Sequence, residues 1–344
     1  MLNVGIIGYG RIGSEHAGWI ADSGAARVAA VADQTPARRA LAEERGLNAV
    51  ATDDELLNDE NIDAVLIAVP TAMHFDVAMR AIVSGKHVMV EKPMAIDLSQ
   101  SEHMHAEAKR RNRVLSVFHN RRWDLDYLSV RKAIQSGVFG KLINIESRLG
   151  QFASCVGPAA KEYRPNWRNE AEFGGGGLYD WGSHFVDQVW RLMLPAKPVR
   201  VFAQMRANVW SAECDDFTRV AIDFSDGTAA MVEINTTTTR PLPRWHIDGT
   251  KGSASSEPSA DFDTRVWAGL VFTPAPTEGQ EDEPQALPIA DGEGLTEPMI
   301  WRQFADAVAG KGEPAVTAES VLITMRLLDA ARDSARKGQA VSVE

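Results

Sequence analysis

The tripeptide Glu91-Lys92-Pro93 places a lysine where acid–base chemistry could occur. It follows the apolar run 88–90, which we expect to be a buried strand, and open α/β sheets bind ligands beyond the carboxyl ends of their strands. A lysine beside a carbinol can donate a hydrogen bond to it or exchange a proton with it. Pro93 permits a cis peptide that would aim the lysine. Taken alone, the pattern is more simply a surface lysine next to a turn.

A second stretch joins four consecutive glycines, 174–177, to Asp180, His184 and Asp187 on an expected helix that reaches residue 194. The spacing i, i+4 and i+7 puts the three polar side chains on one helical face. A carboxylate one turn from an imidazole can fix its orientation, and histidine transfers protons near neutral pH. The glycines would let the backbone pass close to a ligand. A surface His–Asp pair is the alternative for this segment alone. A metal site needs further ligands, none of which is evident, so we expect no metal.

The N-terminal stretch indicates a cofactor site. An apolar run at 4–7 is typical of a buried strand, a helical pattern follows, and Gly8, Gly10 and Gly13 stand between them in G-x-G-x-x-G register. Such glycines permit a tight turn, the approach of a pyrophosphate and close helix–strand packing, and the helix N-terminus binds the anion. Asp33 ends the next apolar run, 20 residues after Gly13, where a carboxylate can bind an adenosine ribose diol. An ordinary glycine-rich turn, with Asp33 as a helix cap, is the weaker alternative.

The residues after Asp33 bear on the choice of dinucleotide. Arg38 and Arg39 could bind the 2′-phosphate of NADP. An acidic side chain at the strand tip should repel that phosphate, so we expect NAD in preference to NADP.

These sites need a fold that brings strand ends together. Through residue 120, strands that are apolar throughout alternate with helical stretches, which is typical of a parallel sheet covered on both faces. We expect strands at 4–7, 27–32, 48–50, 64–69, 87–90 and 114–118, and helices at 12–21, 36–45, 53–57 and 74–83 and after a capping box at 99–102. The sequence therefore predicts an N-terminal α/β Rossmann domain over residues 1–120.

The pattern changes after residue 120. A helix is expected at 125–136, followed by strands with alternating polarity at 141–151, 199–210, 218–224 and 228–238, the last two joined by a hairpin turn at 225–227. We expect residues 253–285 to be a long excursion at the sheet edge, and two helices, at 298–309 and 318–337 with Thr317 as N-cap, to close the chain. Residues 121–344 are thus predicted to form an α+β domain with a large, mostly antiparallel open sheet.

Bulk properties narrow the class of protein. The 344 residues allow two domains, and the formal net charge of −11 without a basic tract argues against nucleic acid and anionic membranes as partners. Cys155 and Cys214 have no metal-site spacing and suggest no disulfide framework, which favours a reducing compartment. No targeting segment or apolar run of membrane length is seen. We expect a cytoplasmic protein.

Taken in order, these motifs resemble those of the glucose–fructose oxidoreductase, inositol dehydrogenase and rhizopine-catabolism (Gfo/Idh/MocA) family. The motifs that carry the resemblance are the glycine fingerprint with Asp33, the segment 70–74, Glu91-Lys92-Pro93, the segment 120–122 and the Asp180/His184 segment. The resemblance implies Lys92, Asp180 and His184 as the catalytic set and NAD or NADP as cofactor. It also implies a sugar, inositol or related polyol substrate, a C-terminal helix returning to the first domain, and dimers or tetramers formed through the C-terminal sheet. Thr71 departs from the asparagine that many members carry.

The resemblance and the motifs define the expected site. The cofactor-binding residues are predicted to be Gly8, Gly10, Arg11, Ile12, Gly13, Asp33, Pro70, Thr71, His74, Glu91, Lys92, Asn120 and Arg121. The substrate pocket is predicted to include Trp123, Tyr163, Trp167, Arg168 and Trp181, with core packing as the alternative for each tryptophan. In the implied hydride transfer, His184 would take the hydroxyl proton, Lys92 would polarise the oxygen and Asp180 would orient the pair. Whether Lys92 or His184 holds the proton stays open.

Two other functions remain open at this point. A dinucleotide-sensing regulator of the same fold would bind cofactor without turnover, although such relatives tend to lose the catalytic lysine or histidine. A glycosidase-like member would oxidise and re-reduce its sugar with no net change in NAD.

Overall fold

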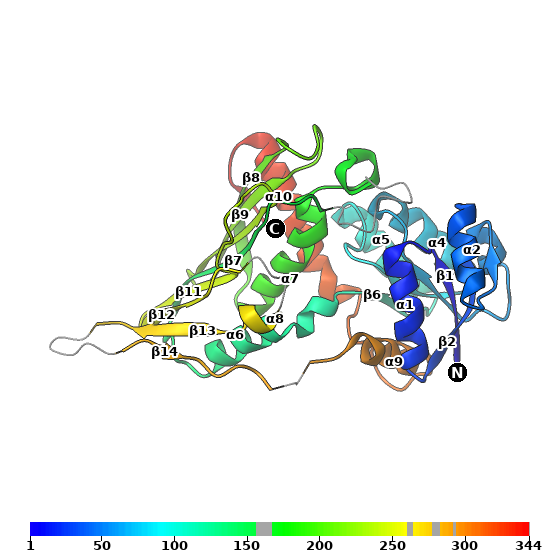
Figure 1. Cartoon of the computed structure of the whole chain (residues 1–344), viewed down its shortest axis with the longest axis horizontal. Coiled ribbons are helices and arrows are strands. Elements are labelled where there is room, and N and C mark those ends of the chain that lie inside the picture. The colour runs from blue at the N-terminus through cyan, green and yellow to red at the C-terminus, as the bar shows by residue number, and fades with distance from the viewer. Residues whose placement is uncertain (156–166, 260–263, 277–282, 292–293, 344) are drawn as a thin grey trace.

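A computed structural model describes residues 1–155, 167–259, 264–276, 283–291 and 294–343 (Figure 1). The chain forms two sheet-containing domains that lie side by side, with α7 and α10 between the large sheet and the N-terminal domain. The parallel sheet of the first domain and the mostly antiparallel sheet of the second confirm the predicted fold class.

The N-terminal domain is built on a six-stranded parallel sheet of order β3-β2-β1-β4-β5-β6. Its strands are β1 (Leu2–Ile7), β2 (Ala26–Ala32), β3 (Ala49–Val50), β4 (Ala64–Ile67), β5 (His87–Val90) and β6 (Leu115–Val117). The order reverses between β1 and β4, and the crevice at such a reversal, beyond the strands' carboxyl ends, is where doubly wound folds bind dinucleotides.

Helices cover this sheet on both faces, as fully buried strands such as Ala64–Ile67 and Leu115–Val117 require. They are α1 (Arg11–Asp22), α2 (Pro36–Glu44), α3 (Asp53–Leu57), α4 (His74–Val83) and α5 (Leu98–Arg110). One predicted start is wrong. The N-cap of α5 is Asp97, whose carboxylate accepts the Gln100 N–H at 2.7 Å, and not Ser99. Aspartate caps a helix by the same bond, so the serine two residues later is an ordinary first-turn residue.

The C-terminal domain is built on a nine-stranded sheet of order β14-β13-β12-β11-β7-β10-β9-β8-β15. Its strands are β7 (Leu142–Gly150), β8 (Pro198–Arg206), β9 (Phe217–Phe224), β10 (Ala229–Asn235), β11 (Trp245–Gly249), β12 (Gly252–Ser256), β13 (Leu270–Pro274), β14 (Gln285–Ala286) and β15 (Val341–Ser342). All neighbours are antiparallel except β7 and β10. Gly227, at φ 88°, sits in the predicted hairpin turn between β9 and β10.

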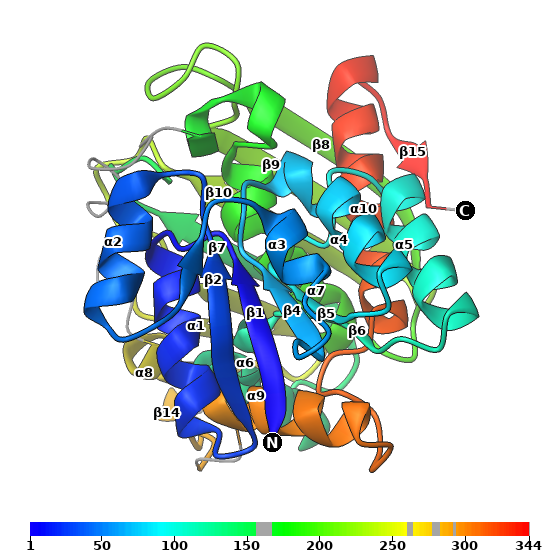
Figure 2. The same cartoon turned by 90° about the vertical axis from the view of Figure 1, so that its right-hand side faces the viewer.

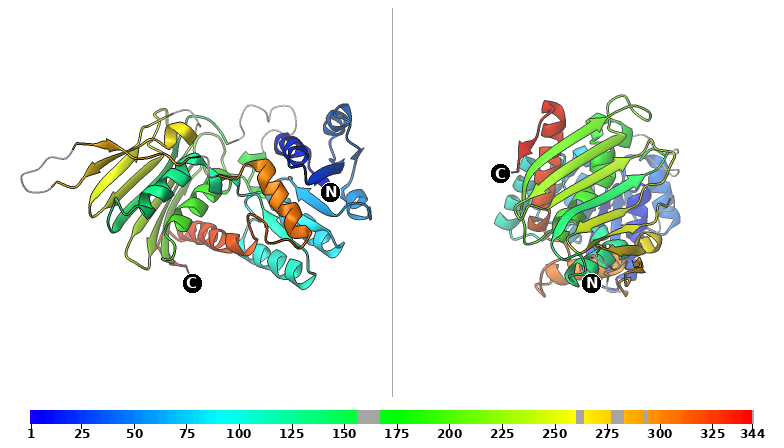
Figure 3. Two further views of the ribbon diagram at one scale, coloured as in Figure 1. Left: turned by 90° about the horizontal axis from the view of Figure 1, so that it is seen from below. Right: turned by 90° about the vertical axis from the view of Figure 1, so that its left-hand side faces the viewer.

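Helices cover one face of this sheet. They include α6 (Leu125–Gln135), α7 (Ser183–Leu192), α8 (Thr264–Trp267) and α10 (Glu319–Lys337). The right-hand view of Figure 3 looks onto the opposite face, which no helix of the described residues covers. Buried Val201 and Ala203 of β8 face the helices, whereas Phe202 between them faces outward and is 40% exposed.

The predicted excursion at 253–285 is wrong in part. It contains most of β12, the short helix α8 and β13, which extend the sheet toward its β14 edge. β12 has the sequence Gly-Ser-Ala-Ser-Ser, whose small residues carry little of the alternating hydrophobicity that marks a strand. It forms because β11 and β13 pair with it on both sides.

Two C-terminal helices bind the second half of the chain to the first domain. α9 (Glu297–Val308) packs on α1, where Trp301 Nε1 donates to His16 Nδ1 at 2.9 Å, and Figure 2 shows it at the lower edge of the parallel sheet. α10 packs on α5, α7 and β8. The Leu98 N–H donates to the carboxylate of Asp329 on α10 at 2.8 Å. Among the described residues, no helix is long and apolar enough to cross a bilayer.

Candidate active site

A cleft of about 970 Å³ runs between the two domains. Its lining begins at the carboxyl ends of the parallel strands, with Gly8 after β1, Asp33 after β2, Glu91 after β5 and Phe118 after β6. The second domain lines it with Arg168, the glycine run, Asp180, Trp181 and His184. The two stretches singled out for proton chemistry therefore meet in one cleft.

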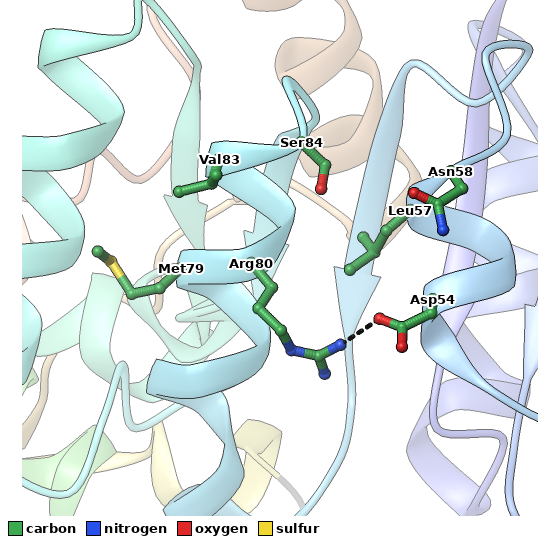
Figure 4. Close-up of a pocket in the computed structure, with 7 residues that line it drawn as sticks. All are labelled: Asp54, Leu57, Asn58, Met79, Arg80, Val83 and Ser84. Carbon is green, nitrogen blue, oxygen red and sulfur yellow. Dashed lines mark hydrogen bonds and ion pairs between the residues drawn. The ribbon is translucent and has the colours of Figure 1, made fainter.

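A separate hollow of about 280 Å³ lies between α3 and α4. In Figure 4, Arg80 reaches across it toward Asp54, and the two side chains form an ion pair at 2.6 Å beside Leu57. None of the predicted site residues lines this hollow. We therefore place the functional site in the larger cleft.

The glycine-rich turn forms one end of the cleft. A Cβ on Gly8, which has φ 93°, would lie 2.6 Å from the Ala68 carbonyl oxygen, and one on Gly13 would collide with the Gly8 carbonyl oxygen. A Cβ on Gly10 would instead meet nothing closer than the Arg38 guanidinium at 3.8 Å. The first backbone hydrogen bond of α1 joins Ser14 N–H to the Gly10 carbonyl, which leaves the N–H groups of Arg11, Ile12 and Gly13 outside the helical ladder. This open, N–H-rich turn fits a dinucleotide pyrophosphate.

Asp33 occupies the position expected for ribose recognition and is 7% exposed. Its carboxylate accepts the N–H groups of Tyr9 and Thr35, each at 2.8 Å, so the loop after β1 and the start of α2 both hold it. Arg38 lies 3.5 Å from the same carboxylate. Arg39 turns away, donating to the carbonyl oxygens of Asp33 and Gln34. Asp33 therefore neutralises the arginine that could have bound a 2′-phosphate.

The remaining predicted cofactor-binding residues line the cleft as a group: Pro70, Thr71, His74, Glu91, Lys92, Asn120 and Arg121. The His74 ring lies 2.9 Å from the Pro93 carbonyl and 3.0 Å from the Val69 carbonyl, so it braces the loops after β4 and β5. Burial lowers the pKa of His74, and the two carbonyl contacts oppose that shift. Asn120 donates to Glu297 at 3.2 Å, which joins this part of the cleft to α9.

Glu91 belongs to a buried chain of hydrogen bonds that the sequence did not reveal. Trp301 Nε1–H can only donate, so His16 Nδ1 accepts it and the Nε2–H of His16 is left to donate to Glu91 at 2.9 Å. The other Glu91 oxygen accepts the Lys92 N–H at 3.0 Å. Burial opposes ionisation of Glu91, yet the His16 hydrogen bond and nearby charges lower its pKa. The network fixes the backbone that carries Lys92.

Lys92 crosses the cleft to the second domain. Its Nζ donates to the Asp180 carbonyl oxygen at 2.8 Å and to the Asp180 carboxylate at 3.1 Å. Arg168 Nε donates to the same carboxylate oxygen at 3.3 Å. Burial opposes ionisation of Asp180, but the Lys92 and Arg168 cations lower its pKa, so it is ionised at neutral pH. The peptide bond between Lys92 and Pro93 is cis.

The expected alignment of Asp180, His184 and Asp187 is wrong. Asp180 lies in a π-helical turn, Leu178–Gly182, that precedes α7, and its partners are Lys92 and Arg168 rather than His184. Because a π turn bonds i to i+5, the i, i+4 spacing of an α-helix does not apply there. Asp187 forms a buried ion pair with Arg122 at 2.8 Å and does not line the cleft.

His184 faces the cleft and is 5% exposed. Its Nδ1 has no hydrogen-bond partner among the described residues. Burial first, and then the charge of Lys92, lower its pKa well below the usual value, so the imidazole is neutral at pH 7. His119, which the sequence analysis missed, packs edge-on against it with ring centroids 5.5 Å apart. Burial lowers the pKa of His119 to about 4. No spacing in the sequence links these two histidines.

The glycine run serves packing between segments. A Cβ on Gly174 would lie 3.0 Å from the Thr71 Cβ, and one on Gly175 would collide with the Arg168 carbonyl oxygen. A Cβ on Gly176, which has φ 110°, would collide with the Asp215 carboxylate. The run lets the second domain approach the loop after β4 closely, in addition to lining the cleft.

Three of the five predicted substrate residues line the cleft: Trp167, Arg168 and Trp181. Arg168 stacks on Trp167 at 4.4 Å, and Arg121 stacks on Trp181 at 4.6 Å. Trp123 does not line the cleft. It packs among the buried apolar residues of both domains, as the core-packing alternative for tryptophan anticipates. Tyr163 lies outside the described residues. The described residues contain no group of three or more histidine, cysteine and acidic side chains that could hold a metal.

A Rossmann domain that carries a lysine at its nucleotide crevice, closed by a second domain that supplies an aspartate partner and a histidine, is typical of a dinucleotide-dependent oxidoreductase. The chain belongs to the Gfo/Idh/MocA family of oxidoreductases. The family model described as "Oxidoreductase family, NAD-binding Rossmann fold" matches residues 2–119, and the GFO/IDH/MocA C-terminal domain model matches residues 127–255. The chain is therefore an enzyme that uses a nicotinamide dinucleotide.

Relatives span the whole chain at modest identity. The uncharacterized oxidoreductase YdgJ of Escherichia coli K12 is 29% identical over 97% of this chain and 96% of its own length. The scyllo-inositol 2-dehydrogenase (NADP(+)) IolW of Bacillus subtilis is 27% identical over 85% and 82%. Among solved structures, an NAD-binding protein from Listeria innocua matches with a TM-score of 0.88 and 29% identity, covering 100% of this chain and 97% of that protein.

Proposed function

We propose that this enzyme transfers a hydride between NAD(P) and a carbinol or carbonyl carbon of a sugar, inositol or related polyol. The observation that carries the proposal is the pairing of Lys92 and Asp180 across the cleft, beside His184. These groups lie beside the position that a carbinol would occupy next to a dinucleotide bound at the ends of the parallel strands. The naming of a relative as an inositol dehydrogenase supports the substrate class.

The pairing bears on which residue holds the proton. An ammonium has three N–H donors, and Lys92 directs two of them at Asp180, so the third can reach a substrate oxygen. Asp180 stabilises the protonated lysine. Among the described residues, no carboxylate pairs with His184, since its expected partner Asp180 is bound to Lys92, and burial lowers the pKa of His184. We infer that Lys92 exchanges the proton with the substrate oxygen, a different assignment from the one the family resemblance favoured.

The remaining side chains position the substrate. A neutral His184 can hydrogen-bond the reacting hydroxyl and hold its C–H bond toward the nicotinamide, which supplies the hydride acceptor or donor when bound. During oxidation the hydroxyl proton passes to a deprotonated Lys92 Nζ, and during reduction the ammonium returns it. Asp33 favours NAD, while Arg38 beside it could bind the 2′-phosphate of NADP after a small rearrangement.

The test is the absorbance of reduced nicotinamide formed from NAD or NADP with a panel of inositols, aldoses and sugar acids. Lys92→Met should abolish turnover while cofactor still raises the unfolding temperature. Net cofactor reduction supports the proposal. Hydrolysis of glycosides without it would favour a glycosidase-like enzyme, and cofactor binding with neither reaction would favour a dinucleotide sensor.

We also propose that the enzyme assembles through the uncovered face of the nine-stranded sheet. Phe202 on β8 points away from the helices and is 40% exposed, and its cross-strand partner Ala221 continues the outward row to Met231. Apolar side chains on an uncovered sheet face are typical of a subunit interface. Light scattering of the purified chain measures the assembly.

A further inference from the structure

The substrate end of the cleft holds two cations, Lys92 and Arg168, that both contact the carboxylate of Asp180. The Glu91 carboxylate also lies beside Lys92, which leaves Arg168 as the less compensated of the two cations. Arg121 is already paired with Asp124 at 2.8 Å, and Glu297 is held by Asn120. The side chains of Lys92, Asp180 and Arg168 are only 15%, 16% and 23% exposed, so bulk water screens their charges incompletely.

Arg168 is oriented to bind an anion. Its Nε contacts Asp180, and stacking on Trp167 at 4.4 Å fixes the guanidinium plane. Within the described residues, neither terminal nitrogen of Arg168 has a hydrogen-bond acceptor. A guanidinium held in this way presents its remaining N–H groups as a planar fork, the geometry that binds a carboxylate through two parallel hydrogen bonds.

We propose that the natural substrate is a sugar acid whose carboxylate binds Arg168 while the carbinol to be oxidised binds Lys92. This inference rests on the proposed function and names its substrate class. Arg168 and Lys92 contact the same oxygen of Asp180, so one small molecule can reach both cations. A carboxylate matches the planar N–H fork of Arg168 and adds to the charge compensation that the shared Asp180 carboxylate gives it only in part. A phosphate ester would bring nearly two negative charges close to Asp180 and Glu91.

The experiment compares neutral sugars with derivatives that carry a charged group at carbon 6. The value of kcat/KM is measured for glucose against glucuronate, galactose against galacturonate, and glucose 6-phosphate, with wild type, Arg168→Gln and Arg168→Lys. Arg240→Gln is the matched control, because it removes an arginine that is exposed and does not line the cleft. Protection against unfolding by NAD verifies that each variant folds and binds cofactor.

We expect the acids to exceed their neutral counterparts by about 10- to 100-fold in kcat/KM, the range of one charge-assisted hydrogen-bonded pair. Arg168→Gln should reduce that ratio to about one, Arg168→Lys should keep only part of it, and Arg240→Gln should leave it intact. Neutral sugars oxidised as well as the acids, or the phosphate ester preferred, would overturn the inference while the proposed function stands. Turnover of no member of the panel would count against the proposed function and the inference together.

Discussion

Replacement of Asp180 by asparagine tests whether this carboxylate serves Lys92 or His184. Two unit charges 3.1 Å apart attract by about 5 kcal/mol at an effective dielectric constant of about 20. Desolvation and the competing Arg168 at 3.3 Å offset much of this attraction, leaving about 2–3 kcal/mol. Asp180→Asn should therefore lower kcat/KM by about 30- to 150-fold.

A double-mutant cycle assigns the Asp180 interaction to one partner. Asp180→Asn is combined with Lys92→Met in one cycle and with His184→Gln in another, and the free energy of unfolding is measured for each single and double variant. If Asp180 stabilises the Lys92 ammonium, the first pair should show a coupling of about 2 kcal/mol and the second should be nearly additive.

Two results would refute this reasoning. Strong coupling of Asp180 with His184, with Lys92 additive, would restore the aspartate–histidine pair that the helical spacing predicted. An unchanged kcat/KM of Asp180→Asn would show that this carboxylate does not assist the reaction. Binding of NAD to every variant, measured by thermal shift, controls for loss of fold.

Three further predictions use other parts of the molecule. The pKa of His119 is lowered from 6.5 to about 4 in the fold, so the unfolded chain binds a proton first as pH falls, and the free energy of unfolding should drop by about 3 kcal/mol between those pH values. Chemical denaturation of His119→Gln should show a weaker dependence of this free energy on pH in that range. The control His103→Gln, at an exposed position, should keep the wild-type dependence. Gly13→Ala should cost about 1–3 kcal/mol and weaken NAD binding, since its Cβ collides with a backbone carbonyl, whereas Gly18→Ala on the same helix has free space and should raise the unfolding temperature slightly. Phe202→Glu should shift light-scattering mass toward the monomer without loss of helical circular dichroism, and an unchanged mass would rule out that face as the interface.

The cofactor end of the cleft could be predicted from sequence because its chemistry is local. Gly8, Gly10 and Gly13 lie within one turn, and Asp33 ends the adjacent strand, so backbone geometry alone brings them together. Lys92 could be placed for the same reason, at the end of a strand in a parallel sheet. These predictions needed only strand order and the rule that ligands bind at strand ends.

The proton-transfer partners could not be predicted, because they depend on packing between distant segments. The π turn before α7 breaks the helical spacing that suggested an Asp180–His184 pair. His119 meets His184 because the segment after β6 packs against α7, and His16 meets Glu91 because α1 contacts the residue that follows β5. Strand β12 likewise depends on its neighbours rather than on its own residues. In each case tertiary contacts override local pattern.

The contacts of Asp187 explain how a site formed by two domains keeps its geometry. Its carboxylate receives two hydrogen bonds from Arg122, each at 2.8 Å, and one from Thr324 of α10 at 2.7 Å. Arg122 lies just after β6 and also binds Ser320, so this buried junction joins the end of the first sheet, α7 and α10. Separating such a buried pair leaves uncompensated charge, at a cost of several kcal/mol. Helix α7 also carries His184 and begins beside Asp180. The junction that binds Asp187 away from the cleft therefore also holds Asp180 and His184 opposite Lys92.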